Sequence, residues 1–276
     1  MSIKNTLLLV ILTFYASFGQ DKNFLQNEIM AAGDSIKFIQ IRTDSLFNSQ
    51  QIISYLIFPQ KAFEKFKIEI AYSQKDLKKT STFGINYNAI AAVNGSFFDV
   101  DSGGSVTYIE VNDSVISKTK SSILSWAKPD SLIDGVVIIT RDLKISLQPV
   151  KPDSFYENSK QEDAVMVSGP LLLLNSEKVK LPRMDFVFKR HPRTFLCTYK
   201  GSIIFITVDG RSEEGEGMTL FEAQKFLQDL GCDDALNLDG GGSTTMWLKN
   251  KGVVNFPSDK TGERPVANAL LILRKK

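Results

Sequence analysis

The chain has 276 residues, of which 43% are hydrophobic and 23% are charged, so it has enough apolar material for an ordinary globular core. Lys and Arg number 33 against 31 Asp and Glu, which gives a formal net charge of +2. This balance excludes the broad positive field of a nucleic-acid-binding protein, so we expect no nucleic-acid partner, and a bound anion must be held by a local cluster.

The first 19 residues predict a secretory signal peptide. Lys4 precedes an apolar run over residues 6–15, and small residues at Ser17 and Gly19 mark a cleavage site. The run is too short to span about 30 Å of hydrocarbon, so we interpret it as a signal and not as a membrane anchor. We therefore expect a mature chain, residues 20–276, that is exported to the periplasm or beyond and makes no stable membrane insertion.

Short apolar segments rich in β-branched residues predict strands through the first two thirds of the chain. Pro-containing and polar stretches separate them as loops, and no repeat or shift in composition marks a domain boundary. We expect one domain over 20–276, in which residues 20–84 have an uncertain role that could include substrate choice. The expected strands cover 36–42, 52–58, 66–72, 89–93, 106–111, 136–140 and the run 165–174, which is broken at Ser168-Gly169-Pro170.

Two cysteines, Cys197 and Cys232, lie in the last third of the chain. An exported protein could join them in a disulfide, but we interpret them as two small buried thiols and leave their pairing open. Neither lies in a metal-binding spacing and the chain has 1 His, so we expect no metal site and no cofactor.

The last third of the chain predicts a hairpin followed by a βαβ unit. Strands over 194–199 and 202–208 flank a short turn at Gly201. Thr219 and Glu222 form a capping box that begins a helix over 219–230, which Gly231 ends. A strand over 235–239 follows, and then a glycine turn, a strand over 243–248 and a final strand over 266–273. The predicted fold class is α+β, with a mixed β-sheet, few helices and this C-terminal βαβ unit.

Asp209 and Asp239 each follow the last apolar residue of a strand, and each precedes a glycine. If the strands 202–208 and 235–239 lie parallel in one sheet, both carboxylates emerge at the same edge, where ligands of such sheets bind. As adjacent strands they would lie roughly 5–10 Å apart. Each Asp could instead cap its own turn.

Polar residues near these two Asp predict an anion site. The run Gly240-Gly241-Gly242-Ser243-Thr244 offers backbone amides that can form an anion-binding nest, although a flexible turn is the alternative. Arg193, Arg211 and Arg264 each lie beside a turn and could hold phosphate oxygens, or could be solvated surface charges. The lone His191 titrates near neutral pH but could also be structural.

Residues 85–276 resemble the phosphodiester glycosidase family, which includes the lysosomal uncovering enzyme that removes N-acetylglucosamine from a mannose 6-phosphate diester. The order and spacing of six motifs carry the resemblance. They are Asn94-Gly-Ser-Phe-Phe-Asp99, His191-Pro-Arg-Thr194, Val208-Asp-Gly-Arg211, Gly217-Met-Thr-Leu-Phe-Glu222, Asn237-Leu-Asp-Gly-Gly-Gly-Ser-Thr-Thr-Met246 and Arg264-Pro-Val-Ala-Asn268.

The resemblance implies hydrolysis of a sugar C1–O bond with a phosphomonoester as leaving group and a carbohydrate phosphodiester as substrate. Two other functions are left open, namely a non-catalytic protein of carbohydrate binding or envelope polysaccharide assembly, and a phosphodiesterase that cleaves P–O.

We assign candidate roles within this reaction. Asp239 or Asp209 is the nucleophile or general base, and His191 assists the departing oxygen. Arg193, Arg211 and the amides of residues 240–244 hold the phosphate. Asn94 and Asn237 bind sugar hydroxyls, and Arg264 and Asn268 complete the binding site.

Overall fold

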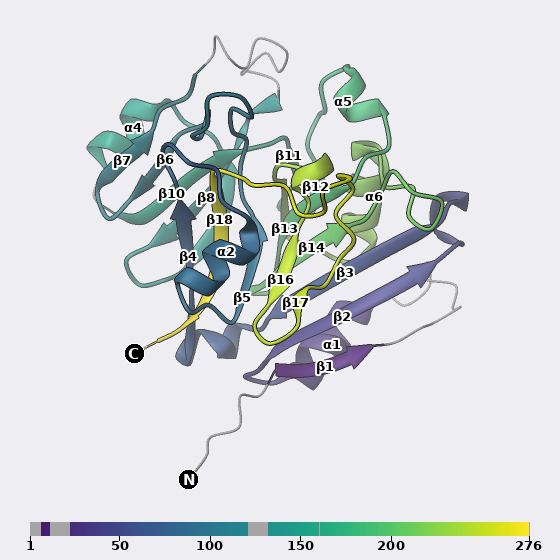
Figure 1. Cartoon of the computed structure of the whole chain (residues 1–276). Helices are drawn as coiled ribbons and strands as arrows, with labels where there is room; N and C mark the ends of the chain where they lie inside the picture. Colours follow the sequence, from purple (N-terminus) through teal and green to yellow (C-terminus); the bar gives the residue numbers. More distant parts are fainter. Residues whose placement is uncertain (1–6, 12–22, 121–131, 160, 276) are drawn as a thin grey trace.

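The computed structural model describes residues 7–11, 23–120, 132–159 and 161–275. Three β-sheets with a few helices outside them make up the fold, as the α+β prediction requires (Figure 1). The predicted signal peptide lies outside the described residues except for β1 (Leu7–Ile11), which is the edge strand of the large sheet and pairs parallel with residues 36–40. No helix in the described ranges is long and apolar enough to cross a membrane.

The large sheet combines strands from both ends of the chain. Residues 20–84 contribute two of its strands directly beside the predicted hairpin, so this region is part of the same sheets as the C-terminal motifs. In spatial order the sheet contains β1, β2 (Ile36–Thr43), β3 (Gln51–Phe58), β14 (Ser202–Val208), β13 (Arg193–Tyr199), β15 (Asp234–Asn237), β11 (Leu171–Leu174) and β12 (Glu177–Lys178).

Two five-stranded sheets complete the fold. The second contains β7 (Ser114–Ser117), β6 (Ile109–Val111), β10 (Glu162–Ser168), β8 (Gly135–Thr140) and β9 (Ile145–Pro149). The third contains β17 (Gly252–Val253), β16 (Met246–Leu248), β5 (Ala91–Asn94), β18 (Asn268–Arg274) and β4 (Phe66–Tyr72). One apolar core joins all three sheets, with Phe205 from the large sheet, Met166 from the second and Leu270 from the third.

Helices cover the outer faces of these sheets. They are α1 (Phe24–Ala32), α2 (Thr80–Asn86), α4 (Asp153–Asn158), α5 (Asp185–Phe188) and α6 (Leu220–Asp229), with short 3-10 turns η1 (Leu46–Asn48), η2 (Gln60–Glu64) and η3 (Gly241–Ser243). Helix α6 begins at the predicted capping box, where the Thr219 hydroxyl accepts from the Glu222 amide and Glu222 accepts from the Thr219 amide. Its apolar side packs on the large sheet in a second core.

In the predicted βαβ unit, the parallel strands β14 and β15 were expected to be neighbours, but β13 lies between them. Strand β13 pairs antiparallel with both β14 and β15, so those two are parallel to each other but not adjacent. The ends of β14 and β15 are therefore about two strand spacings, or roughly 10 Å, apart. The reason is that β3 pairs with the other side of β14, so β15 pairs with the open side of β13.

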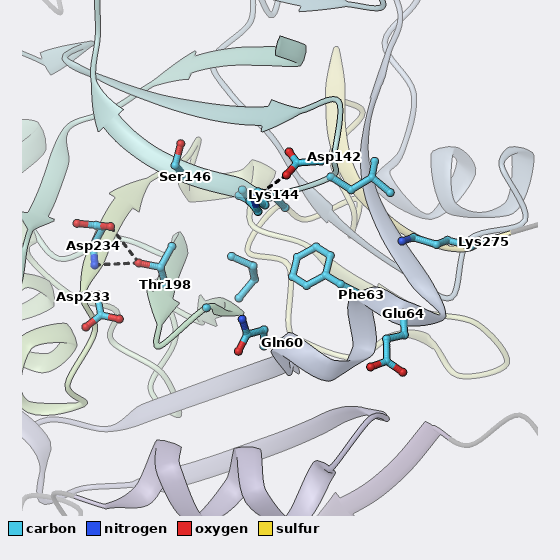
Figure 2. A pocket seen from close by; sticks show the side chains of 14 residues that line it. Gln60, Phe63, Glu64, Asp142, Lys144, Ser146, Thr198, Asp233, Asp234 and Lys275 are labelled. Carbon is cyan, nitrogen blue, oxygen red and sulfur yellow. Dashed lines mark hydrogen bonds and ion pairs between the residues drawn. The ribbon is translucent and has the colours of Figure 1, made fainter. Parts of the chain in front are cut away.

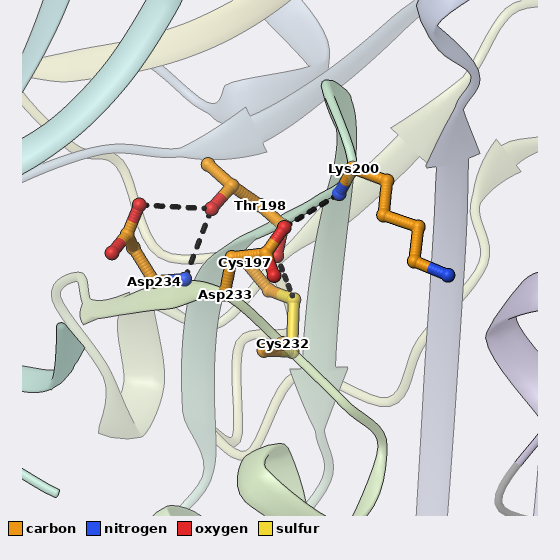
Figure 3. Close-up of a disulfide and its surroundings, with 6 residues drawn as sticks. All are labelled: Cys197, Thr198, Lys200, Cys232, Asp233 and Asp234. Carbon is orange, nitrogen blue, oxygen red and sulfur yellow. Dashed lines mark hydrogen bonds between the residues drawn. A yellow bond between two sulfur atoms is a disulfide. The ribbon is translucent and has the colours of Figure 1, made fainter. Parts of the chain in front are cut away.

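Cys197 and Cys232 form a disulfide with a Cα–Cα distance of 5.9 Å, so the interpretation as two separate thiols was wrong (Figure 3). Cys197 is in the middle of β13, and Cys232 lies in the short connection from α6 to β15. The pairing of β13 with β15 brings Cys197 opposite Ala235 and so places the two cysteines together.

Candidate active site

The ends of strands from two sheets meet at the candidate site. Asp239 follows β15 and Arg193 begins β13 in the large sheet, whereas Asn94 ends β5 in the third sheet. The Asn94 side-chain amide donates to the Asp239 carbonyl at 2.7 Å, and the Asp239 amide donates to the Gly95 carbonyl at 2.9 Å. These two bonds hold the glycine turn of one sheet against the strand end of the other.

Three arginines approach the glycine turn, one at each glycine. A Cβ on Gly240 would lie 3.8 Å from Cδ of Arg193, and one on Gly241 would lie 2.9 Å from Nη2 of Arg211. A Cβ on Gly242 would lie 2.3 Å from Nη2 of Arg264. Any side chain at Gly241 or Gly242 would displace a guanidinium, so these glycines are explained by close approach as well as by turn conformation.

Arg193 is fully buried, and no carboxylate among the described residues pairs with it. Its Nε donates to the Met218 carbonyl at 3.0 Å, and its Nη2 donates to the carbonyls of Phe186 and Lys189 at 2.6 and 3.1 Å. Burial, assisted by the charge of Arg211, lowers the pKa of Arg193 to about 9. Its Nη1 is buried and has no hydrogen-bond partner, so the guanidinium still has a donor for an anion.

The other two arginines differ in their partners. Arg264 makes a bidentate ion pair with Asp259, with Nε–Oδ2 and Nη2–Oδ1 distances of 2.7 and 3.0 Å. Arg211 is exposed and has a positive φ of 65°, which turns the chain sharply after β14 and brings its guanidinium to Gly241. The site therefore contains one buried, one exposed and one ion-paired guanidinium.

Asp239 is half-buried, and one of its oxygens accepts from the Gly240 amide at 2.9 Å. Burial raises the pKa of Asp239 to about 6, although the Ser243 hydroxyl, the Gly240 amide and the charge of Arg264 oppose the rise. At neutral pH this carboxyl group is therefore mostly ionised, and a minor fraction of it is protonated. It is the more accessible of the two predicted carboxylates.

Asp209 is nearly enclosed, with 2% of its surface exposed. Its Oδ1 accepts from the Asn255 side-chain amide at 3.0 Å and from the Phe256 amide at 3.1 Å, and its Oδ2 is buried without a partner. Burial raises the pKa of Asp209 to about 7. Asp209 therefore lies behind the site, where it holds the loop at residues 255–256.

His191 lies within electrostatic range of Arg193 and Arg211. Burial, together with the charges of Arg193, Arg211 and Lys189, lowers the pKa of His191 below its ordinary value, so the imidazole is neutral at neutral pH. Its Nδ1 is buried and has no hydrogen-bond partner. The backbone of His191 pairs with that of Met218, which fixes the main chain at this position.

Buried polar atoms without partners gather around this turn. Burying such an atom is costly unless water or a ligand pairs with it, so their concentration here indicates a polar ligand. Among the described residues the group includes His191 Nδ1, Arg193 Nη1, Asp209 Oδ2, Asn237 Oδ1, Thr244 Oγ1 and Thr245 Oγ1.

The three asparagines predicted at the site, Asn94, Asn237 and Asn268, are all buried in the protein. Asn94 and Asn268 have no exposed surface. The side-chain oxygen of Asn94, Oδ1, accepts from the Thr194 hydroxyl and from the Thr245 backbone amide. Asn268 binds both backbone groups of Ser96. Buried and bonded in this way, Asn94 and Asn268 hold loops in place. Asn237 is also enclosed, but its side-chain oxygen keeps a free acceptor.

The glycine-turn amides are also engaged within the protein. The Gly240 amide donates to Asp239, the Gly241 amide donates to the Pro192 carbonyl at 2.9 Å, and the amides of Ser243 and Thr244 close the 3-10 turn. These amides fix the turn, and the guanidinium groups remain as the main anion donors. In the described ranges, no group of three or more His, Cys, Asp or Glu side chains is placed to hold a metal ion.

Sequence reasoning missed two residues of the site. Asn255 is nearly buried, donates to Asp209 and to the Thr244 carbonyl, and accepts from the Met246 amide. Asp259 pairs with Arg264 beside Gly242. A signal for both was present in Asn255-Phe-Pro-Ser-Asp259, a polar turn that closely precedes the Arg264 motif.

Comparison with known proteins identifies related sequences. A family model described as phosphodiester glycosidase matches residues 87–273. The chain is 42% identical over 60 residues to the N-acetylglucosamine-1-phosphodiester alpha-N-acetylglucosaminidase of Bos taurus, covering 22% of this chain and 11% of that protein. It is 37% identical over 84 residues to the SPbeta prophage-derived uncharacterized protein YomE of Bacillus subtilis (strain 168), covering 30% of this chain and 13% of that protein. The matched segments thus span only a small part of these relatives.

Solved structures share the fold at low sequence identity. The catalytic domain of zebrafish N-acetylglucosamine-1-phosphodiester alpha-N-acetylglucosaminidase, auto-inhibited by its pro-peptide, superposes with a TM-score of 0.67 and 19% identity, covering 87% of this chain and 83% of that one. A hypothetical protein from Synechocystis gives a TM-score of 0.62 and 14% identity, covering 87% and 64%. These likenesses concern the fold.

Proposed function

Because the chain belongs to the phosphodiester glycosidase family, we propose that it is an exported hydrolase that cleaves the sugar C1–O bond of a sugar-1-phosphodiester. The products are a free sugar and a phosphomonoester. One observation carries this proposal, namely that the buried Arg193 guanidinium has an unpaired Nη1 at the turn where Arg211, Arg264 and Asp239 also meet. N-acetylglucosamine is the sugar that the named relatives suggest.

The leaving group determines which side chains the reaction needs. An ordinary glycosidase uses one carboxylic acid to protonate a poor leaving group and a second carboxylate for attack or for activation of water. A phosphomonoester leaves with its own negative charge, so cationic donors that stabilise the growing charge can replace the acid. A site with three guanidinium groups and one accessible carboxylate has the composition that this chemistry requires.

Each side chain then has a specific task. Arg193, Arg211 and Arg264 bind the phosphate oxygens, and neutral His191 forms a hydrogen bond to the departing oxygen as the C1–O bond breaks. The electron pair of that bond leaves with the phosphate. Asp239 is the carboxylate at the anomeric carbon, and the anomeric configuration of the product distinguishes direct attack from activation of water. Asp209 positions the site from behind.

Two further features of the structure support export and a single domain. The Cys197–Cys232 disulfide supports export, because disulfides persist in oxidising compartments and are rare in the cytosol. The region 20–84 and the family motifs share two sheets, which supports one domain over residues 20–276. Cleavage at the predicted signal site would remove β1, the outermost strand of the large sheet.

The proposal is tested with a pair of substrates that share the same sugar. One is the methyl phosphodiester of N-acetylglucosamine-1-phosphate, and the other is methyl N-acetylglucosaminide, which has no phosphate. We expect sugar release from the phosphodiester alone. Equal release from the simple glycoside, or binding of the phosphodiester without any product, would contradict the proposal.

A further inference from the structure

A cavity lies at the other end of the large sheet from the candidate active site. Its volume is about 620 Å³, a size typical of sites that bind small molecules. It is formed between η2, the turn of the β13–β14 hairpin, the start of β15 and the β8–β9 hairpin (Figure 2). Arg193 begins β13 and Thr198 lies next to its last residue, five positions further on, so the two sites are separated by about 17 Å.

One wall of this cavity is fixed before any ligand arrives. The Thr198 hydroxyl donates to the Asp234 carboxylate at 3.2 Å and accepts from the Asp234 amide at 3.0 Å (Figure 3). The Asp233 carboxylate accepts from the Lys200 amide at 2.6 Å. The Cys197–Cys232 disulfide ties the same two segments together one residue away. A wall held in this way loses little conformational freedom when a ligand binds.

Opposite this wall the cavity offers an aromatic ring and an amide. Phe63 is half-buried and packs edge-on against Phe58, with ring centroids 4.5 Å apart, and its ring lies among the lining side chains (Figure 2). The Gln60 side chain lies over Gly201, where a Cβ would come within 3.0 Å of Nε2. A ligand here would meet an apolar ring face together with an amide donor and acceptor.

The charges of the lining residues indicate the class of ligand. Glu64, Asp142, Asp233 and Asp234 bring four carboxylates against the two ammonium groups of Lys144 and Lys275. This excess of carboxylates disfavours an anion such as phosphate, and the carboxylate oxygens can accept hydrogen bonds from the hydroxyl groups of a ligand. The combination of hydrogen-bonding groups with one aromatic face matches a sugar ring, which has polar edges and an apolar face.

We propose that this cavity binds a neutral sugar unit, separate from the sugar that is hydrolysed. The hydroxyls donate to Asp233 and Asp234, and the ring lies on Phe63. Other molecules with several hydroxyl groups could make the same contacts, and we choose a saccharide because the proposed substrate contains a sugar, so this part of the proposal rests on the proposed function. Because the two sites are about 17 Å apart, a short phosphodiester bound at the active site does not reach the cavity, and its cleavage is independent of it.

Binding is tested by NMR titration of the full chain with trisaccharides that carry no phosphate, namely chitotriose, maltotriose and mannotriose. We expect at least one to shift the amide signals of Thr198 and Gly201, and to do so equally in the Asp239→Asn variant. Inorganic phosphate should leave these signals unchanged. Because the probes contain no phosphodiester, failure here is distinguishable from failure of the proposed hydrolysis.

Two variants identify the cavity as the place of binding. Phe63→Leu keeps an apolar side chain without the ring, and Gln60→Ala removes an exposed amide with little risk to folding. Each should weaken saccharide binding by at least about fivefold and leave cleavage of a short phosphodiester unchanged. Phe155→Leu, at an exposed aromatic residue of α4, should leave the affinity unchanged. The proposal is overturned if no trisaccharide shifts these signals up to roughly 10 mM, or if both variants bind as the wild type does.

Discussion

The Asn94 side-chain amide donates to the backbone carbonyl of Asp239 across 145 positions of sequence, at a distance of 2.7 Å. This bond joins the end of β5 in the third sheet to the glycine turn of the large sheet. Asn94 has no exposed surface. Its side-chain oxygen accepts from the Thr194 hydroxyl and from the Thr245 backbone amide, which lie on either side of the same junction. The position of the proposed catalytic carboxylate is therefore set by contacts between sheets.

Asp239→Asn should lower kcat/KM by more than about tenfold, equivalent to about 1.4 kcal/mol of transition-state stabilisation. The amide keeps the size of the side chain but cannot act as a nucleophile or base. In the wild type, kcat/KM should rise as the pH increases through about 6, because burial raises the pKa of Asp239 to about 6 and the ionised form is the active one. A pH profile of kcat/KM for both proteins measures this, and an unchanged rate in the variant would refute the assignment.

Arg193→Lys should lower kcat/KM by about 100-fold although the charge is kept. Lys has a single ammonium group and cannot bond to the carbonyls of Met218, Phe186 and Lys189 while presenting a further donor to phosphate. The matched variant is Arg211→Lys, in which the exposed guanidinium has fewer constraints and the loss should be smaller. Steady-state kinetics gives kcat/KM for both variants, and thermal unfolding checks that both are folded. If Arg193→Lys keeps kcat/KM within about threefold of the wild type, Arg193 does not bind the phosphate in this way.

Gly241→Ala should reduce activity more than Gly252→Ala does. Both glycines have a positive φ, at 61° and 77°, so both substitutions carry a similar backbone strain of roughly 1–2 kcal/mol. A Cβ on Gly241 would lie 2.9 Å from Nη2 of Arg211, whereas one on Gly252 meets no heavy atom within 4 Å. Comparison of kcat/KM between variants of similar stability isolates the guanidinium contact, and equal activities would show that it does not matter.

Asp209→Asn should change how stability depends on pH. Burial raises the pKa of Asp209 to about 7, whereas an Asp in an unfolded chain titrates near 3.9, so the native state binds the proton more tightly. This contribution to stability is fully present below about pH 4 and is lost as the pH rises through about 7. Asn keeps an acceptor for Asn255 and Phe256 but does not titrate. Urea unfolding at pH 5 and pH 8 should therefore show a smaller loss of stability in the variant, and equal losses would contradict the prediction.

Local signals in the sequence predicted much of the fold. The hairpin turn at Gly201 and the capping box at Thr219 and Glu222 depend on residues near one another in the chain, and both were found where expected. Helix α1 was missed because its apolar residues follow the helical period only weakly. The strand expected over 243–248 begins only at Met246, because the first residues form the 3-10 turn η3.

The sequence predicted which residues form much of the candidate site, but not which contacts they make. The motifs named Arg193, Asp239 and the glycines, and the structure brings these together. The insertion of β13 between β14 and β15, and the burial of Asp209 by Asn255, depend on pairings between distant segments that no local pattern encodes. For the same reason, Asn94 and Asn268 could not be recognised as residues that hold loops.

The most direct test of the proposed reaction is hydrolysis of a sugar-1-phosphodiester in water labelled with the heavy oxygen isotope, followed by mass spectrometry of both products. If the carboxylate of Asp239 acts at the anomeric carbon while the guanidinium groups stabilise the departing phosphate, the label enters the C1 hydroxyl of the free sugar. Label in the phosphomonoester would mean cleavage of the P–O bond and would contradict the account.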